Sequence, residues 1–485
     1  MFWKRLFATK SLEMLHAEMV GENRLRRILG PIGLTSLGVG AIIGSGIFVM
    51  TGQVAADDAG PAILLSFVVA GIACALAALC YAEFASMAPV AGSAYTYAYA
   101  TLGEMFAWII GWDLILEYLF GAATVAVGWS GYVASFLSDI GLTLPPNLGN
   151  GPITFHDGRW LLTGAVLNVP ALLIIAVLTI ILILGIRESA WVNATIVFLK
   201  LAVIILFIIA GFPHVKPENW TPFVPPNAGQ FGQFGWTGVL AAAGIIFYAY
   251  IGFDAVSTAA QETKKPERDM PVGILGSLIV CTVLYILVSL VLTGVVNYKE
   301  LNVPAPVAFA VQQIGSSVAW IRPLIELGAI AGLSSVILVL LLGQPRIFYR
   351  MAADGLLPPI FAKIHPKFRT PYITTALTGL IAALVASLFP IEVLGALVSI
   401  GTLLAFVIVC VGVWVLRRTR PELPRGFRTP WVPLVPILGA FVCFGQMVFL
   451  SLETWLRLLV WLIIGLLIYF GYSRHHSRIH QVSPP

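Results

Sequence analysis

Twelve apolar segments, each long enough to cross a lipid bilayer, constrain the fold of this chain more than any other feature. A membrane-spanning helix needs about 20 apolar residues, because each helical residue rises about 1.5 Å. Segments of that length lie near residues 33–54, 60–88, 101–134, 167–186, 191–212, 236–259, 272–297, 323–350, 371–389, 393–417, 432–450 and 454–472. The longest outer connection, 141–166, is rich in Pro and Gly, and there we expect a small re-entrant or surface helix. The sequence thus predicts an all-α polytopic membrane protein with about twelve transmembrane helices.

Composition excludes a soluble protein and offers no metal site. Apolar residues make up 59% of the chain and charged residues 11%, whereas a soluble domain carries about 25% charged residues. All five cysteines lie in apolar segments and all seven histidines lie in loops or termini, so no cluster of metal ligands is expected. We predict no metal and no cofactor. The mixed, basic residues up to about Leu29 are not expected to form a cleavable signal.

The basic residues predict the orientation in the membrane. Of the 28 Lys and Arg residues, 22 fall at segment ends that share a side with the N-terminus, and five fall at the opposite ends. Because Lys and Arg accumulate in cytoplasmic loops, both termini are expected to be cytoplasmic. The net charge of +5 is therefore an orientation signal and does not indicate a nucleic-acid partner.

The first apolar segment carries four glycines within residues 38–48, and each costs a helix interior roughly 1 kcal/mol relative to Ala. The simplest account is a helix that breaks near Gly44, Ser45 and Gly46 at mid-membrane depth. Freed backbone groups are tolerated at that depth only where they line a cavity or meet a ligand. Two alternatives compete, because Gly40 and Gly44 form a GxxxG pair typical of close helix packing and the glycines approach the dinucleotide-binding fingerprint. The second alternative is rejected, since the spacing is one residue off and no strand precedes it.

The sixth segment repeats this pattern within residues 244–255. An aromatic stripe there is more often packing, but Gly252 and the intramembrane Asp254 favour a break at Ile251 and Gly252. Paired interrupted helices at matching positions of two five-span halves are the best sequence indication of a transporter site. We therefore divide the chain into a cytoplasmic N-terminal segment, two inverted five-helix repeats, helices 11 and 12, and a cytoplasmic tail. The corresponding residues are 1–32, 33–212, 236–417, 432–472 and 473–485.

One basic residue, Lys200, lies inside an apolar segment. It is about 10 residues, or about 15 Å, from the basic start of that segment, where a lysine costs about 2.5–3.5 kcal/mol even on the insertion scale. One interpretation is a structural pair with a buried carboxylate. We favour a functional ammonium that cycles its proton or stands where a metal cation might otherwise bind.

Acidic residues inside the segments are few. Asp113 and Glu117 are one helical turn apart and share a face, which we expect to point into the protein. Glu83 lies near the cytoplasmic end of its segment, where we predict a structural pair with an Arg. Glu326 lies near an outer end, where a gate role and a position on the rim are equally supported.

Six stretches of the sequence resemble the amino acid–polyamine–organocation (APC) transporters, and most closely their cationic amino acid transporter branch with its bacterial members. These stretches are residues 38–48, 81–84, 89–95, 111–118, 250–257 and 354–358. The match covers nearly the whole chain in the same order. It implies a LeuT-like fold, a 5+5 inverted repeat with helices 1 and 6 broken and two extra helices.

The resemblance also implies a substrate site. The substrate carboxylate would meet the amides of Gly44, Ser45 and Gly46, at the start of a half-helix whose dipole favours an anion. The α-amino group would meet backbone carbonyls at Ile43, Tyr248, Ala249 and Ile251. Tyr248 occupies the place of the aromatic gate in this family.

Further residues follow from the same resemblance. Lys200 is similar to the lysine of proton-coupled members, which occupies the place of a sodium ion, and Ser334 and Ser335 would lie near it. Glu117 and Asp254 resemble acids that shape the site or recognise a basic side chain.

The predicted function is secondary active transport of L-amino acids by alternating access, with Lys200 as the proton-coupling residue. The substrate is cationic (Arg or Lys), for which Glu117 is the candidate acid, or small and neutral like Ala, which the glycines and serines fit. An exchanger or an uncoupled facilitator is the alternative within this class. A channel would need filter residues repeated in several chains, and a membrane-embedded enzyme would need a nucleophile–base or metal set, so neither is favoured.

The predicted location is a cell membrane, with short loops that suit a bacterial inner membrane. The predicted partners are the amino acid, protons and the bilayer, and a small membrane-protein partner is left open.

Overall fold

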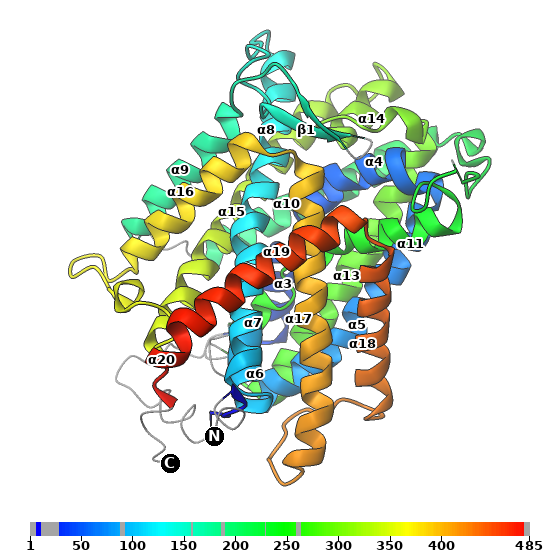
Figure 1. Ribbon diagram of the computed structural model, residues 1–485. Helices are drawn as coiled ribbons and strands as arrows, with labels where there is room; N and C mark the ends of the chain where they lie inside the picture. Colours follow the sequence, from blue (N-terminus) through cyan, green and yellow to red (C-terminus); the bar gives the residue numbers. More distant parts are fainter. Residues whose placement is uncertain are drawn as a thin grey trace.

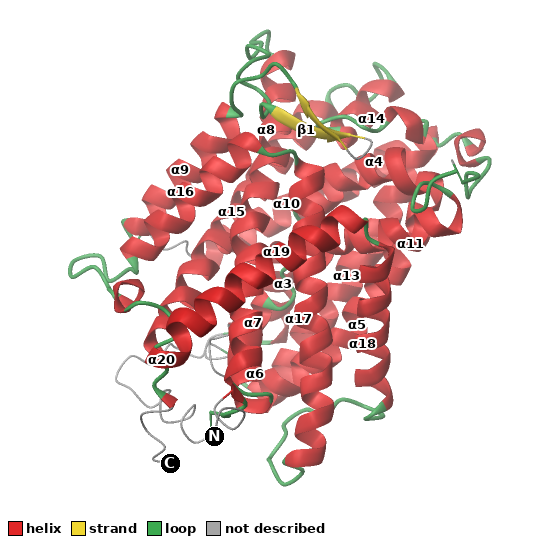
Figure 2. Ribbon diagram, in the orientation of Figure 1, coloured by secondary structure: helices red, strands yellow, loops and turns green. Residues whose placement is uncertain are grey.

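The chain forms a bundle of helices joined by short loops (Figure 1). The computed structural model describes residues 6–10, 29–87, 93–156, 159–185, 190–227, 229–258 and 263–479. Within these residues the regular structure is helical apart from one two-stranded hairpin (Figure 2). The predicted all-α class is therefore confirmed.

Seven helical stretches in the described part of the chain are long and apolar enough to cross a membrane. They are Gly46–Met87, Glu104–Asp139, Ala194–His214, Pro266–Val295, Ile321–Ala353, Ile391–Thr419 and Leu452–His476. Shorter apolar helices of 10–17 residues lie at Pro31–Ile42, Val169–Ile183, Gly235–Tyr250, Tyr372–Leu388 and Leu434–Phe449. A helix that is apolar all round packs against neighbours on one face and tolerates lipid on the other.

The elements that surround the centre of the bundle are named as in Figure 1. They are α3 (Pro31–Ile42), α5 (Ile63–Met87), α7 (Glu104–Ile115), α8 (Gly121–Asp139), α10 (Ala190–Gly211), α11 (Gly235–Ile246), α13 (Pro266–Val295), α15 (Ile321–Ala353) and α17 (Ile391–Thr419). Around them lie α4 (Thr51–Val54), α6 (Ser93–Thr101), α9 (Val169–Ile183), α12 (Ala255–Thr258), α14 (Pro306–Ile314), α16 (Tyr372–Leu388), α18 (Leu434–Phe449), α19 (Leu452–Ile468) and α20 (Arg474–His476). The first and sixth predicted segments are divided into short pieces, α3 with α4 and α11 with α12.

The expectation of a re-entrant or surface helix within residues 141–166 is wrong. This stretch forms an antiparallel hairpin of β1 (Ile153–His156) and β2 (Arg159–Leu162). The Arg457 guanidinium of α19 lies 4.9 Å from the ring centre of Phe155 and 5.6 Å from that of Trp160. These cation–π contacts come from a residue almost 300 positions away in sequence, which local sequence patterns cannot show.

Helix α19 crosses the bundle obliquely in front of α7 and α17 (Figure 1). Two tryptophans fix the crossing, because the Trp112 indole donates to the Trp461 carbonyl at 2.8 Å and the Trp461 indole donates to the Trp112 carbonyl at 3.3 Å. Its outer face is apolar and exposed, as at Leu456, Val460 and Leu467. A lipid-facing helix has this distribution.

The described parts of the two termini meet at one end of the bundle, which we call the terminal side. Lys10 Nζ donates to Asp354 Oδ1 at 2.8 Å, and burial lowers the pKa of this ammonium while Asp354 opposes that shift. Glu104, at the start of α7, accepts hydrogen bonds from the hydroxyls of Tyr99, Tyr469 and Ser477. Segments from both ends of the sequence therefore close this side of the bundle.

Some sequence predictions fall outside the described residues. These include residues 89–92 of one family-like stretch and the basic residues Lys4, Arg5, Arg24, Arg26, Arg27 and Arg187.

The predicted pairing of Glu83 is confirmed. Its carboxylate accepts from Arg417 Nε at 2.7 Å and from Arg425 Nε at 3.0 Å. The Glu326 side chain is buried and accepts from Ser135 Oγ at 2.5 Å and from Arg322 Nε at 3.3 Å, and both interpretations, a gate role and a position on the rim, stay predictions.

Candidate substrate and coupling site

The first helix break lies where the glycines predicted it. Helix α3 ends at Ile42, and Ile43 has ψ 98°, which leaves the helical region. Ile43 and Gly44 are non-helical, Ser45 returns to helical dihedrals, and a π-helical turn, η1, follows at Gly46–Met50. All of these residues are buried. A buried break of this kind leaves backbone amides and carbonyls that need partners from other elements.

The second break also lies close to its predicted position. Helix α11 ends at Ile246, a 3-10 turn covers Phe247–Tyr250, and residues 251–254 form a turn before α12. Gly252 has φ +113°, a conformation that L side chains rarely adopt. A Cβ there would also meet the Ala41 carbonyl oxygen at 2.8 Å. The second break therefore needs glycine for both conformation and space.

The two breaks touch each other. A Cβ on Gly46 would lie 2.4 Å from the Cα of Ala249, so the backbone of the first break packs directly on that of the second. Ser45 Oγ and the Tyr248 hydroxyl are 2.8 Å apart and share a hydrogen bond. The structure thus brings together Gly44, Ser45 and Gly46 with Tyr248 and Ala249, as the sequence predicted.

Lys200 reaches the first break from α10. Its side chain is fully buried, and Nζ donates to the Gly40 carbonyl at 2.7 Å and to the Ile43 carbonyl at 3.1 Å. Gly40 lies in the last turn of α3 and Ile43 directly follows the helix, where helix geometry leaves C=O groups without amide partners. The ammonium therefore supplies donors that the broken backbone lacks. The Ile43 carbonyl, predicted to meet a substrate amino group, already accepts from Lys200.

Two residues that the sequence analysis missed hold the second break. The Tyr285 hydroxyl of α13 lies 3.0 Å from the Ile42 carbonyl and 2.5 Å from the Ala249 carbonyl, so it bridges both breaks. Ser399 Oγ of α17 donates to the Ile245 carbonyl at 2.9 Å and accepts from the Tyr248 amide at 3.1 Å. Both residues sit inside apolar helices, and only their partners, more than 30 residues away in sequence, mark them as functional candidates.

A small cavity of about 20 Å³ lies at the crossing of the breaks, which is room for about one water molecule. Five of the predicted substrate-binding residues line it: Gly44, Ser45, Gly46, Tyr248 and Ile251. The remaining wall is aliphatic or small and comes from α3, α8 and α15: Ala41, Ile42, Gly121, Val125, Val336 and Leu340. Sites for small molecules combine an apolar wall with a few polar groups in this way. No Asp, Glu, Lys or Arg is part of this described lining.

Glu117 and Asp254 lie together but do not line the cavity. Glu117 Oε2 accepts from Thr402 Oγ1 at 3.3 Å, Asp254 Oδ2 accepts from the Tyr118 hydroxyl at 3.3 Å, and the two carboxyl groups are close enough to interact electrostatically. Asp113 points into the protein as predicted and is 1% exposed.

The two serines predicted near Lys200 occupy different faces of α15. Ser334 accepts from the Trp129 indole of α8 at 2.9 Å. Ser335 donates to the Gly332 carbonyl of its own helix at 3.1 Å. Of the two, Ser335 is therefore tied to the turn of α15 that faces Lys200, because Gly332 packs on the Lys200 side chain.

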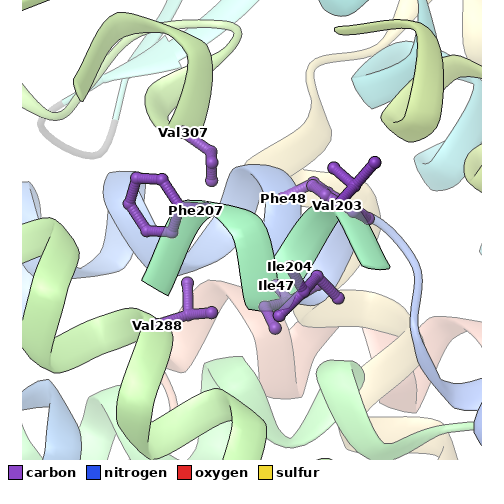
Figure 3. Close-up of a pocket in the computed structure, with 7 residues that line it drawn as sticks. All are labelled: Ile47, Phe48, Val203, Ile204, Phe207, Val288 and Val307. Atoms are coloured by element: carbon purple, nitrogen blue, oxygen red, sulfur yellow. The ribbon is translucent and has the colours of Figure 1, made fainter. Parts of the chain in front are cut away.

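A second space beside the first break is wholly apolar. Ile47 and Phe48 of the first break face Val203, Ile204 and Phe207 of α10, with one valine each from α13 and α14 (Figure 3). Since no polar atom lines it, this space offers nothing to a charged substrate. It is a packing contact between the first break and α10.

The arrangement defines a class of protein. Two broken helices crossing at a buried cavity, inside a bundle of helices long and apolar enough to span a membrane, are the hallmark of a membrane transporter. The model of the amino acid permease family matches residues 29–470. The chain belongs to the amino acid permease family, within the APC superfamily.

Characterised relatives share most of their length with this chain. It is 49% identical to the branched-chain amino acid permease BcaP of Bacillus subtilis over 98% of this chain and 99% of that protein. It is 48% identical, over the same shares of the two chains, to the methylthioribose transporter of Bacillus subtilis. The vacuolar cationic amino acid transporter 4 of Arabidopsis thaliana is 40% identical over 83% of this chain and 65% of the relative. The resemblance to the cationic amino acid transporters is thus confirmed at the family level.

Proposed function

We propose that this permease transports L-amino acids with a neutral, apolar side chain, and that it couples their entry to protons by alternating access. The aliphatic wall of the cavity is the observation that carries the choice of substrate. Val125, Ile251, Val336 and Leu340 line the space next to Ser45. Burying a cationic side chain against such a wall would cost several kcal/mol without a paired acid, whereas an aliphatic side chain gains about 0.8 kcal/mol per buried CH₂. Of the substrates weighed from sequence, the neutral class is therefore favoured over Arg or Lys.

The polar edge of the cavity suits the amino acid backbone. Gly44, Ser45 and Gly46 would receive the carboxylate, since the start of the helical stretch Gly46–Met87 carries unpaired amides and a positive dipole end. The α-amino group would share the carbonyls of Ile43 and Ala249 with Lys200 and Tyr285. Such sharing is feasible because each carbonyl oxygen has two lone pairs.

Lys200 is proposed as the proton-coupling residue. In its protonated form it holds the carbonyls of Gly40 and Ile43 and so stabilises the first break. In its neutral form it keeps at most two N–H donors and no charge, which weakens this hold. A change of protonation would then bias the conformation of the carboxylate-binding segment, which is what coupling requires.

The proposed architecture is the 5+5 inverted repeat with two additional helices, and both termini are proposed to be cytoplasmic in a cell membrane. The distribution of basic residues supports the orientation, and the matching positions of the two breaks support the repeat. The terminal side of the bundle would then face the cytoplasm.

Uptake into proteoliposomes tests this proposal. We expect labelled leucine or valine to accumulate when the outside is acidic, and labelled arginine to enter at least about tenfold more slowly. A methylthioribose arm belongs in the same assay, because one relative is named for that compound. Preferential uptake of arginine or methylthioribose would overturn the substrate assignment. Equal leucine flux with and without the gradient would instead identify a facilitator or exchanger.

A further inference from the structure

Helix α15 has no side chain at the point where Lys200 passes it. A Cβ built on Gly332 would lie 2.9 Å from Lys200 Cγ, 3.2 Å from Cε and 3.3 Å from Cδ. Optimal contacts between carbon atoms are about 3.5–4.0 Å. The whole stem of Lys200 therefore lies on the surface of this glycine.

One turn earlier, a second glycine fixes how closely the two helices pack. A Cβ on Gly328 would lie 2.3 Å from Val203 Cγ2 of α10. Val203 also faces the first break in the apolar space described above (Figure 3). Gly328 thus sets the helix spacing through a valine, whereas Gly332 meets the lysine itself.

We propose that Gly332 is a positioning residue for Lys200: by leaving α15 bare, it lets the buried stem place its ammonium at the carbonyls of the first break. This inference rests on the proposed coupling role of Lys200. The same face of α15 continues at four-residue intervals to Val336 and Leu340, which line the cavity. One helix face therefore positions the coupling lysine and forms a wall of the substrate site.

The groups facing Lys200 are compatible with this role. From α13, the Cys281 thiol lies within electrostatic reach of Lys200, and Tyr285 contacts the neighbouring Ile42 carbonyl. Helices α3 and α14 contain no titratable residue. The charged or titratable residues that remain on the packed elements lie toward helix ends: Glu267, Arg268, Asp269, His214, Arg322, Glu326, Arg346, Tyr349 and Arg350. If the ammonium were displaced, its charged form would lose the hydrogen bonds to the two carbonyls. No carboxylate on the described central turns of these helices could replace them.

The test is the pH dependence of leucine binding by the purified full-length chain. In Gly332→Ala the midpoint of the pH dependence of leucine binding should move to lower pH by about one unit. The charged form of Lys200 loses hydrogen-bond acceptors there, while its neutral form loses little. The matched control is Gly328→Ala combined with Val203→Ala, which adds a methyl group to the same helix face and makes room for it. Its midpoint should match that of the wild type. A wild-type midpoint in Gly332→Ala would overturn the inference.

Two further variants separate this inference from the proposed function. Lys200→Met should bind leucine with no pH dependence. If leucine binding by Lys200→Met kept the wild-type midpoint, the coupling role of Lys200 would be overturned. If Gly332→Ala does not fold, Lys200→Ala is compared with Lys200→Ala/Gly332→Ala. The double variant should melt at the same temperature as Lys200→Ala, because the missing stem leaves space for the methyl group. A double variant that also fails to fold would show that Gly332 serves helix packing alone and overturn the inference.

Discussion

The two helix breaks cross at one cavity, yet they satisfy their backbone groups by different chemistry. The first break is held by the Lys200 ammonium, which donates to the carbonyls of Gly40 and Ile43. The second is held by the hydroxyls of Ser399 and Tyr285, at the carbonyls of Ile245 and Ala249. Hydrogen bonds from a charged donor are roughly twice as strong as those between neutral groups. One break is therefore tied by a group that can change charge, and the other by groups that stay neutral near pH 7.

We infer from this difference that the two breaks have separate tasks in the proposed site. A neutral hydroxyl clamp keeps its strength across the physiological pH range, so the second break is a fixed half of the site. A lysine clamp can respond to a proton. The Tyr285 hydroxyl contacts a carbonyl from each break. A conformational change at the first break would therefore reach the second break through this side chain.

Forcing the breaks apart should have the largest effect. Gly46→Ala would place a Cβ 2.4 Å from the Ala249 Cα, and a displacement of about 1 Å at a reacting or binding centre costs about 100-fold. We expect leucine transport to fall by about that factor while the protein still purifies as a folded monodisperse species. Gly445→Ala in α18 is the control, because nothing lies within 4 Å of a Cβ there. Wild-type uptake by Gly46→Ala would refute the direct contact of the breaks.

Removing the bridging hydroxyl should have a smaller effect. Tyr285→Phe leaves the Ile42 and Ala249 carbonyls without this donor, and an unsatisfied buried group costs about 1–3 kcal/mol. Leucine binding measured by calorimetry should weaken about tenfold at every pH. Tyr250→Phe is the matched control, since its hydroxyl donates to Phe67 of α5 and to neither break. Equal losses of leucine affinity in Tyr285→Phe and Tyr250→Phe would contradict the bridging role of Tyr285.

Loosening the second break alone should have the smallest effect. Ser399→Ala removes partners of the Ile245 carbonyl and the Tyr248 amide, which should cost about 1 kcal/mol and lower the melting temperature by a few degrees. This loss should be the same at pH 5 and pH 8, because no charge is involved. Ser387→Ala, whose hydroxyl only bonds its own helix, should change little. If the decrease in melting temperature of Ser399→Ala depended on pH, the distinction between a charged first break and a neutral second break would be contradicted.

Glycine and charge made the outline of this site predictable from sequence. Four glycines in one apolar run and a glycine beside an aspartate in another are too costly for plain helices, so both breaks could be located. A lysine at mid-membrane depth is equally conspicuous. Gly44, Ser45, Gly46, Tyr248 and Ile251 do line one cavity.

The partners of these residues could not be predicted, because they belong to ordinary apolar helices. Tyr285, Ser399 and Gly332 are ordinary residue types, and only the residues that they contact, up to 243 positions away in sequence, mark them as functional candidates. The hairpin at β1 and β2 was missed for the same reason, since its contact with Arg457 is tertiary. Glu117 and Asp254 were expected to contribute to the substrate site, but they bond to Thr402 and Tyr118 and are not part of the cavity lining.

The most direct test of the account is gradient-driven leucine uptake by Lys200→Met and Lys200→Arg in proteoliposomes. Met keeps much of the stem without the charge, and Arg keeps a charge that does not titrate. An inward proton gradient is expected to stimulate neither variant, while exchange of leucine at equal pH persists at a measurable rate. Stimulation equal to that of the wild type in Lys200→Met would contradict the central claim that the first break is the proton-responsive half of the site.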